Sequence, residues 1–444
     1  MGTLQTLLAF AFVLGVLVFV HELGHFLAAK RVGIRVLKFQ LGFNPTIFSF
    51  RRGDTEYSIG ALPLGGFVKM AGESPEDQPT GRDDEFLSKS KWQRFQVLIM
   101  GPVMNLLLAL VLTAVVLYRG AEVPVYEDQP PVVGVVAAGS AGERAGIRPG
   151  DRILAVADRP VSTWEDFFIA IASRPNRETS IDLVRDGGPM TLRVTPAADG
   201  EQGRMEMGEI GVRPDVHPHL LAVSPDEPGA RGGLMVGDVI LSADGTPTTF
   251  DDDFRAIIRK HPNKPMTLSV LRNGSPMSIT VTPRQNGAVG YLGVTPRNET
   301  KRLNPTVVQA IEMSVRKNVQ YGALIFQSLW GLVTRETSFR QLMGPVAIAQ
   351  LSGESAQLGW LALVSLMASI SLNLGLLNLM PIPILDGGHI FIMALEGLAR
   401  RDFSARVKEK MLLTGFVVLM MLMVTVIYND LMRITWIERL VPWR

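Results

Sequence analysis

The stretch VLVFVHELGHFLAAK, residues 16–30, decides which fold the sequence predicts. It lies in an apolar run over residues 7–29, and about 20 helical residues are enough to cross the hydrocarbon core of a bilayer. The run nevertheless contains His21, Glu22 and His25. Ionisable side chains are costly at that depth and usually mark a functional site, so these three residues are candidates for one.

The composition favours a membrane protein and limits the kind of metal site. Of the 444 residues, 47% are hydrophobic and 19% are charged, and the mean hydropathy is +0.21. A net charge of +2 and the lack of a basic arm argue against nucleic acid as a partner. Because the chain has no cysteine, a metal ion would have to be held by His, Asp or Glu.

Four apolar stretches are expected to cross the membrane, at residues 1–30, 95–119, 358–399 and 411–429. The third is too long for one straight crossing, and NLMPIPILDGG, residues 378–388, places two prolines and a glycine pair in its middle. These residues interrupt a helix, and irregular backbone at membrane depth is tolerated only where it lines a cavity or packs on protein. We therefore expect a polytopic α-helical membrane protein with four transmembrane segments, the third one broken.

Lysines and arginines predict how these segments are oriented. They are concentrated in residues 31–94, between the first two spans, and in the loop of residues 400–410 before the fourth. By the positive-inside rule both loops face the cytoplasm. Residues 31–94 are then a cytoplasmic-side loop with membrane-associated β segments, whereas residues 120–357 and both termini lie on the outer side. Residues 304–335 are expected to form an amphipathic helix on that outer face.

The region between the second and third spans contains an internal repeat. AGIRPGDRILAV begins at residue 145 and GGLMVGDVILSA begins at residue 232, so the two segments align at an offset of 87 residues. The same offset relates further positions over about fifty residues, which indicates a duplication. Each unit, residues 127–214 and 215–297, is expected to form short strands around one helix, with hairpin turns at RDGG and RNGS.

These units resemble PDZ domains of the bacterial type, in which an apolar-Gly-apolar loop offers backbone N–H groups to a peptide carboxylate. The resemblance implies two tandem α+β PDZ domains inserted between the second and third transmembrane segments, with a circularly permuted strand order. Peptide C-termini would bind at EIGV and YLGV, whose loop residues are Ile210, Gly211, Val212, Leu292, Gly293 and Val294. The alternative is that both units are folded spacers whose grooves hold no peptide.

The spacing within HELGH, residues 21–25, predicts a metal site. Residues four apart lie on one face of an α-helix, so His21 and His25 can direct ring nitrogens at one ion. Glu22 can reach a water on that ion, as in zinc metalloproteases. A catalytic zinc usually needs a third protein ligand. Asp386, at the break in the third span, is the expected ligand, and His389 is the alternative.

HELGH in the first span together with NLMPIPILDGG in the third resembles the site-2 protease family, zinc metalloproteases that cut substrate helices within the membrane. LPLGGFVKM, residues 62–70, and GPVMN, residues 101–105, also match family sequences, and the resemblance covers essentially the whole chain. It implies one Zn²⁺ per chain and a general base, Glu22. The implied metal ligands are His21, His25 and Asp386.

The resemblance further implies where the protein works and what it cuts. Two tandem PDZ domains are typical of Gram-negative members, so we expect a multi-pass protein of the bacterial inner membrane with periplasmic PDZ domains and termini. The implied substrate is the membrane helix of a single-pass anti-sigma factor, already clipped on its outer side, in an envelope stress response. Remnants of signal peptides are a second implied substrate. The lipid bilayer itself is a partner.

A substrate helix must be unwound before it can be cut, and strands at the cytoplasmic rim are the expected place for this. FQLGF, residues 39–43, and YSIGALPLGGFVKM, residues 57–70, predict such strands, and an extended substrate could pair with them as an added edge. Asn378, beside the break, could hydrogen-bond the substrate backbone or could instead be an amide that packs helices. The strand residues assigned to substrate binding are Gly65, Gly66 and Phe67.

A second class of function stays open at the level of the sequence. The chain could be a membrane-anchored PDZ adaptor whose metal site is structural or vestigial. The two classes differ at Glu22, because a structural zinc has no need of a general base. Replacing Glu22 should therefore inactivate an enzyme and leave an adaptor unaffected, whereas loss of the PDZ pair should disable the adaptor.

Overall fold

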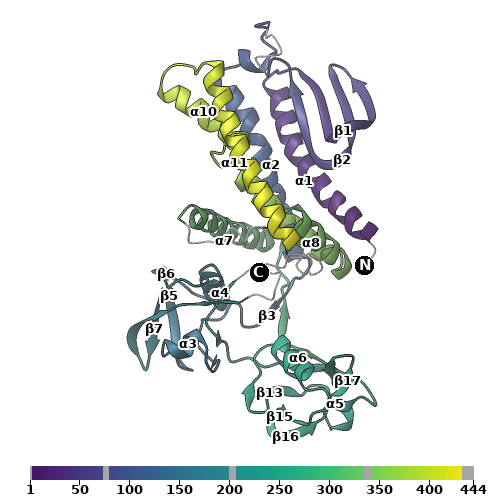
Figure 1. Ribbon diagram of the computed structural model, residues 1–444, viewed down its shortest axis with the longest axis vertical. Helices are drawn as coiled ribbons and strands as arrows, with labels where there is room; N and C mark the ends of the chain where they lie inside the picture. Colours follow the sequence, from purple (N-terminus) through teal and green to yellow (C-terminus); the bar gives the residue numbers. More distant parts are fainter. Residues whose placement is uncertain (1–2, 74–79, 200–206, 335–342, 433–444) are drawn as a thin grey trace. The chain divides into compact units, whose positions relative to one another are not determined.

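The chain consists of two units in the computed structural model (Figure 1). The described residues are 3–73, 80–199, 207–334 and 343–432. The membrane unit comprises Met1–Ala121 and Asn304–Arg444, and the inserted unit comprises Glu122–Leu303. The predictions for the two chain ends, for residues 200–206 of the first repeat and for residue 335 concern positions outside the described residues.

Among the described residues, four helices are long and apolar enough to cross a membrane. They are α1 (Thr3–Arg31), α2 (Lys91–Tyr118), α9 (Trp360–Asn378) and α11 (Ala405–Met432). α2 packs against α1 and α9, and Val13, Leu17 and Met367 form a buried cluster of apolar side chains. α2 begins after Ser90, whose hydroxyl accepts a hydrogen bond from the backbone N–H of Gln93 and so satisfies a donor at the helix start.

In the third predicted span, two helices flank a break. α9 ends at Asn378, residues 379–385 are not helical, and α10 (Asp386–Leu398) follows. The break folds back on the start of α10 at Gly388, where a Cβ atom would overlap the carbonyl group of Ile382. Only glycine leaves room for this close approach, which fixes where α10 begins.

Two further helices precede this span. α7 (Val307–Val333) packs against α2, where the hydroxyl of Ser314 donates to the carbonyl oxygen of Leu110 at 2.7 Å. α8 (Pro345–Leu358) was not predicted from the sequence. Its start is held by the carboxylate of Asp430 in α11, which accepts hydrogen bonds from backbone N–H groups at 3.0 Å each. The donors are Gly344, Val346 and Ala347. A tertiary contact therefore caps this helix, in the way that a local Asp would.

The loop between α1 and α2 folds into two long strands, β1 (Val36–Arg52) and β2 (Thr55–Met70), and the short 3₁₀ helix η2 (Phe86–Ser88). Residues 38–41 pair with both halves of β2, so that Leu41 lies opposite Gly66 and also opposite Ile59. β2 packs against α1. The strands are thereby fixed beside the helix that carries the HELGH motif. Their buried core includes Ala28, Ile34, Phe39 and Val68.

The inserted unit contains the two predicted repeats, and equivalent strands pair in equivalent register. The first sheet has the strand order β6 (Arg159–Pro160), β5 (Arg152–Val156), β7 (Thr179–Arg185) and β8 (Gly188–Val194). The second repeats this arrangement with β14 (Thr246–Pro247), β13 (Val239–Ala243), β15 (Met266–Arg272) and β16 (Ser275–Val281). Ile153 pairs with Leu183 in the first repeat, and Ile240 pairs with Val270 in the second. Both residues of the second pair lie 87 positions further along the chain, so the duplication extends from the sequence to the backbone.

The repeats differ from expectation in their helices. The first consists of β4 (Val135–Val136), α3 (Ala141–Arg144), β5 (Arg152–Val156), β6 (Arg159–Pro160), α4 (Trp164–Ala172), β7 (Thr179–Arg185), β8 (Gly188–Val194), β9 (Ala197–Asp199), β10 (Met207–Glu209) and β11 (Val212–Arg213). The second consists of β12 (His219–Val223), α5 (Pro228–Arg231), β13 (Val239–Ala243), β14 (Thr246–Pro247), α6 (Asp251–Lys260), β15 (Met266–Arg272), β16 (Ser275–Val281), β17 (Arg284–Asn286), β18 (Val289–Tyr291) and β19 (Val294–Arg297). The prediction of one helix per repeat was wrong, because α3 and α5 are too short for a helical period to show.

An arginine and an aspartate form the same pair in both repeats. Arg185 donates to the two carboxylate oxygens of Asp151 at 2.8 and 2.7 Å, and Arg272 donates to those of Asp238 at 2.7 Å each. Burial is the largest influence and raises the pKa of both aspartates, but the arginine hydrogen bond and charge together with a backbone N–H bond, from Arg148 or Met235, lower it further than burial raises it, so the pKa of each lies below its ordinary value. Both aspartates are therefore held as carboxylates in the folded repeats.

The first and last strands of the inserted unit pair with each other. β3 (Glu122–Pro124) and β20 (Thr300–Arg302) are antiparallel, with Glu122 opposite Arg302. Ion pairs between Arg297 and Glu122 and between Lys301 and Asp128 support this ladder. The chain therefore enters and leaves the inserted unit at adjacent positions.

Candidate metal centre

Two histidines of α1 and an aspartate of α10 lie together inside the membrane unit. His21 and His25 are buried, with exposed fractions of 9% and 7%, and Asp386 is the first residue of α10. The Nε2 atoms of the two histidines are 3.2 Å apart. Oδ2 of Asp386 lies 3.1 Å from Nε2 of His21 and 3.4 Å from Nε2 of His25. Within the described part of the chain, these three side chains form the group that could hold a metal ion.

The spacing and chemistry of these atoms fit zinc. Zn–N and Zn–O bonds of about 2.0–2.2 Å place two ligands of a tetrahedral ion about 3.3–3.6 Å apart, close to the three separations in the structure. Imidazole and carboxylate are ligands that zinc prefers, and three protein ligands leave one position open for catalysis. The group therefore has the composition of a catalytic zinc site.

The third member of the group is Asp386 and not the alternative, His389. Both residues belong to α10, but His389 lies almost one helical turn further along and is half-buried outside the group of three. The break before α10 lets the helix begin at Asp386 beside α1. This geometry favours Asp386 as the third ligand, which stays a prediction.

α2 closes one side of the cluster. The backbone carbonyl oxygen of Val97 accepts a hydrogen bond from Nδ1 of His25 at 2.8 Å. Gly101 lies against both rings, since a Cβ atom there would overlap Nε2 of His25 and lie 2.9 Å from Nε2 of His21. Sequence reasoning noted the GPVMN motif that begins at Gly101 but assigned it no task, because the approach of α2 to α1 is not visible in the sequence.

Glu22 lies between the cluster and one of the predicted substrate strands. Its half-buried carboxylate interacts electrostatically with His21, His25 and Asp386. A Cβ atom at Gly66 would lie 3.1 Å from Cγ of Glu22, so the backbone of β2 passes directly beside the glutamate. A base in this position could exchange a proton with a reactant held between the strand and the cluster.

The other predicted substrate residues have less specific surroundings. Gly65 and Phe67 flank Gly66 in β2 and are half-buried. Gly65 lies against the ring of Phe43, which a Cβ atom would approach to 2.6 Å. Asn378 is the last residue of α9 and is half-buried at the start of the break. Gly66, in contrast, lies beside Glu22 of the HELGH motif.

The two predicted carboxylate-binding loops share one backbone arrangement. In the first, the carbonyl oxygens of Ile210 and Gly211 accept hydrogen bonds at 2.7 and 2.8 Å from the backbone N–H groups of Gly142 and Ala137. In the second, the carbonyl oxygens of Leu292 and Gly293 accept equivalent hydrogen bonds, at 2.8 Å each, from the backbone N–H groups of Gly229 and Ser224. Val212 is buried and Val294 is half-buried at the ends of these loops. The loops are thus equivalent elements of the duplication.

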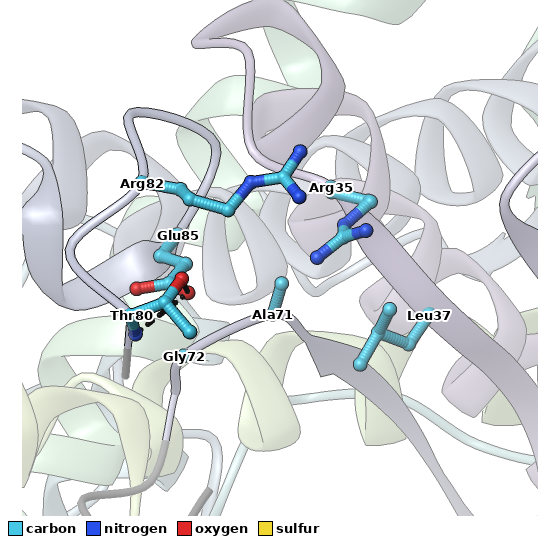
Figure 2. A pocket seen from close by; sticks show the side chains of 7 residues that line it. All are labelled: Arg35, Leu37, Ala71, Gly72, Thr80, Arg82 and Glu85. Carbon is cyan, nitrogen blue, oxygen red and sulfur yellow. Dashed lines mark hydrogen bonds between the residues drawn. The ribbon is translucent and has the colours of Figure 1, made fainter. Parts of the chain in front are cut away.

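A separate pocket of about 280 Å³ lies where β1 and β2 meet the residues after them (Figure 2). Glu85 lines it and accepts hydrogen bonds from the hydroxyl and N–H of Thr80 and from the N–H of Gly81. These bonds, led by that of the Thr80 hydroxyl, hold the pKa of Glu85 below its usual value. The guanidinium groups of Arg35 and Arg82 both interact with Asp84. The carboxylate of Glu85 is therefore occupied by neighbouring hydrogen-bond donors within this pocket.

Similarity to known proteins extends over nearly the whole chain. The sequence model described as peptidase family M50 matches residues 9–422. The regulator of sigma-E protease of Salmonella typhimurium is 34% identical over 456 residues, which are 98% of this chain and 100% of the relative. A protein of Ralstonia nicotianae, described as a candidate zinc metalloprotease, is 33% identical over 97% and 98% of the two chains. Among solved structures, the PDZ domain of an SdrC-like protein from Listeria innocua is 18% identical over 18% of this chain and 92% of its own, with a TM-score of 0.17.

Proposed function

We propose a specific function for this chain on one premise: it belongs to peptidase family M50 and is a site-2-type zinc metalloprotease. In our proposal it cuts the membrane helix of a single-pass protein from within the bacterial inner membrane. The names of its relatives refer to sigma-E regulation. We therefore propose an anti-sigma factor, trimmed beforehand on its outer side, as the main substrate, and signal-peptide remnants as a second class.

The proposed catalytic residues are the four that converge in the membrane unit. His21, His25 and Asp386 would hold one zinc ion per chain, and their separations of 3.1–3.4 Å are the observation that carries this proposal. When bound, zinc supplies Lewis acidity and makes water a better nucleophile near neutral pH. Glu22 would take the proton from the attacking water and later give it to the leaving amine.

The proposed substrate site is the edge of β2 beside Glu22. Within the described chain, the pairing of residues 66–70 runs to β1 on one side, so an extended substrate could add to the other side through backbone hydrogen bonds. Gly66 would bring that substrate next to Glu22, with Gly65 and Phe67 as its neighbours in the strand. Asn378 would hydrogen-bond the unwound substrate at the break.

The proposed orientation follows the positive-inside rule. β1, β2 and the loop before α11 would face the cytoplasm, so that the metal centre lies toward the cytoplasmic side. The inserted unit, α7, α8 and both termini would be periplasmic. We propose that the repeats are tandem PDZ domains that hinder the entry of untrimmed substrates or bind peptide C-termini at their apolar-Gly-apolar loops. Their shared backbone bonds at these loops support equal roles.

The test is cleavage of a pre-trimmed single-span substrate by the purified full chain in detergent. Glu22→Gln should keep its zinc and lose at least about a hundredfold in cleavage rate, the lower end of what a general base contributes. Glu354→Gln, which changes an exposed carboxylate of α8 in the same unit, is the matched control and should cut at the parental rate. Parental activity in Glu22→Gln would support the adaptor function instead.

A further inference from the structure

Asn105 of α2 is a buried residue whose amide faces the metal cluster. None of its surface is exposed, and its Nδ2 atom lies 3.2 Å from Nδ1 of His21. Within the described part of the chain, its Oδ1 atom has no hydrogen-bond partner. A buried amide with one unsatisfied end is uncommon and calls for a physical explanation.

His25 shows what a zinc ligand requires of its second ring nitrogen. The Val97 carbonyl oxygen beside Nδ1 of His25 can only accept, so Nδ1 must carry the hydrogen. A neutral imidazole carries hydrogen on one nitrogen only. Nε2 of His25 therefore keeps its lone pair, and this lone pair faces the place where the three candidate ligands meet.

His21 needs the same arrangement, and this decides the orientation of Asn105. If Nδ2 of Asn105 donated to Nδ1 of His21, the ring hydrogen would sit on Nε2, which lies 3.1 Å from Asp386 and 3.2 Å from His25. That nitrogen could then not bind a metal. Turning the amide by half a turn presents Oδ1 to Nδ1–H instead and gives this oxygen a donor. The two ends of an amide have the same shape, so the hydrogen-bond network determines its orientation.

We infer that Asn105 is a positioning residue of the metal centre, whose side-chain oxygen accepts a hydrogen bond from Nδ1–H of His21 and so directs the Nε2 lone pair at the metal. The inference rests on the proposed function, since it takes the histidines as zinc ligands. α2 then supplies both outer contacts of the pair, a backbone carbonyl at Val97 and a side-chain amide at Asn105. The hydroxyl of Ser371 in α9 holds the backbone carbonyl of Asn105 at 2.7 Å.

Two substitutions at this position separate accepting from donating. Asn105→Asp keeps the shape and can only accept from Nδ1–H as a carboxylate, whereas Asn105→Leu has a similar volume and can do neither. Loss of the outer partner of a metal-ligating histidine weakens metal binding by about 10–100-fold. We expect this loss in Asn105→Leu and binding at least as tight as the parent's in Asn105→Asp. Glu354→Gln, which changes an exposed carboxylate of α8 in the same unit, is the control and should bind as the parent does.

The measurement is the zinc affinity of each full-length variant in detergent, by competition with a chromogenic chelator at one pH. A parent that binds no zinc would overturn the proposed function as well. A parent that binds zinc, with Asn105→Asp as weak as Asn105→Leu, would show that the amide donates and that the inference alone is wrong. Parental affinity in Asn105→Leu would also contradict it. If Asn105→Leu does not fold, tenfold weaker binding by Asn105→Asp is the contradicting result.

Discussion

Gly101 sets how closely α2 approaches the histidine pair. Val97 and Asn105 reach the two imidazoles from this helix, and Gly101 lies between them in the sequence with no side chain to keep the helices apart. A Cβ atom at this point would overlap the His25 ring. The smallest residue of α2 thus lies against the two histidine rings, in keeping with the small residues that let membrane helices approach.

Gly101→Ala is expected to weaken zinc binding by at least about tenfold, the lower end of the effect of lost outer-shell support. The added methyl group must displace His25 or the whole of α2. Chelator competition on the purified chain measures the effect. Gly15→Ala is a matched control in α1, because a Cβ at Gly15 meets no atom within 4 Å. Equal affinities for the two variants would contradict the role given to Gly101.

Asp386→Asn is expected to lower zinc affinity far more than His389→Gln. The substitution replaces a charged ligand oxygen by a neutral one, which binds zinc less strongly, whereas His389 lies outside the group of three. Zinc content after dialysis against a weak chelator distinguishes the two variants. If His389→Gln loses zinc and Asp386→Asn retains it, the ligand assignment is reversed.

The sequence predicted some of these residues because the signal for each lies within a single segment of the chain. His21 and His25 share one helix face by their spacing alone, and Asp386 was inferred from the cost of an unpaired carboxylate at membrane depth. Their proximity in the structure agrees with that reasoning, while their role as ligands stays a prediction. Gly101 and Asn105 act across a helix interface, and small and amide residues in an apolar helix have many uses. No local pattern separates these uses.

At the scale of elements, the long helices and the repeats were the predictable part. Apolar length and an offset of 87 residues are properties of extended stretches and survive local irregularity. α8 was missed because its start is capped by Asp430, a residue more than eighty positions away. α3 and α5 were missed because a single turn has no period. Element type follows from local pattern, whereas short or remotely capped elements depend on tertiary contacts.

The paired aspartates of the repeats predict how stability depends on pH. The pKa of Asp151 and of Asp238 is lowered in the folded chain, so each stabilises the fold above its unfolded pKa of about 3.9, and this contribution is lost as the pH falls through the folded pKa. The double variant Asp151→Asn, Asp238→Asn should melt at a lower temperature than the parent at pH 7. The gap should close as the pH falls below about 4.

Thermal unfolding of both full-length proteins across this pH range measures that gap. Asp158→Asn, a substitution at an exposed turn of the first repeat, serves as the control and should melt with the parent throughout. If the difference in melting temperature between the parent and the double variant stays constant from neutral to acidic pH, the arginine–aspartate pairs are not its cause.

At the scale of the whole molecule, the division into two units separates the candidate metal ligands from the repeats. The candidate ligands and Glu22 belong to the membrane unit, and all residues of the repeats belong to the inserted unit. Composition revealed this division, because the apolar excess lies at the two ends of the chain. Composition could not reveal that the two ends of the central region pair with each other, because β3 and β20 are only three residues each and lie at opposite ends of the insertion.

Replacing residues 122–303 by a short Gly/Ser linker is expected to leave cleavage of the trimmed substrate largely intact and to raise cleavage of an untrimmed one. The linker needs only a few residues, because paired strand residues are about 5 Å apart. The measured quantity is the ratio of the two cleavage rates, with Glu22→Gln in the shortened chain as the blank. An unchanged ratio would refute the entry filter, and a loss of trimmed-substrate cleavage alone would favour peptide binding by the repeats.

The ladder between β3 and β20 also bears on the history of the chain. Since it brings both ends of the insertion together, the repeats form a cassette that the chain enters and leaves at one place. A gene can duplicate, exchange or discard such a cassette without changing the distance that the chain must bridge between α2 and α7. The repeats can then change in sequence or number without any change in the buried centre, with its tightly fitted glycine and amide.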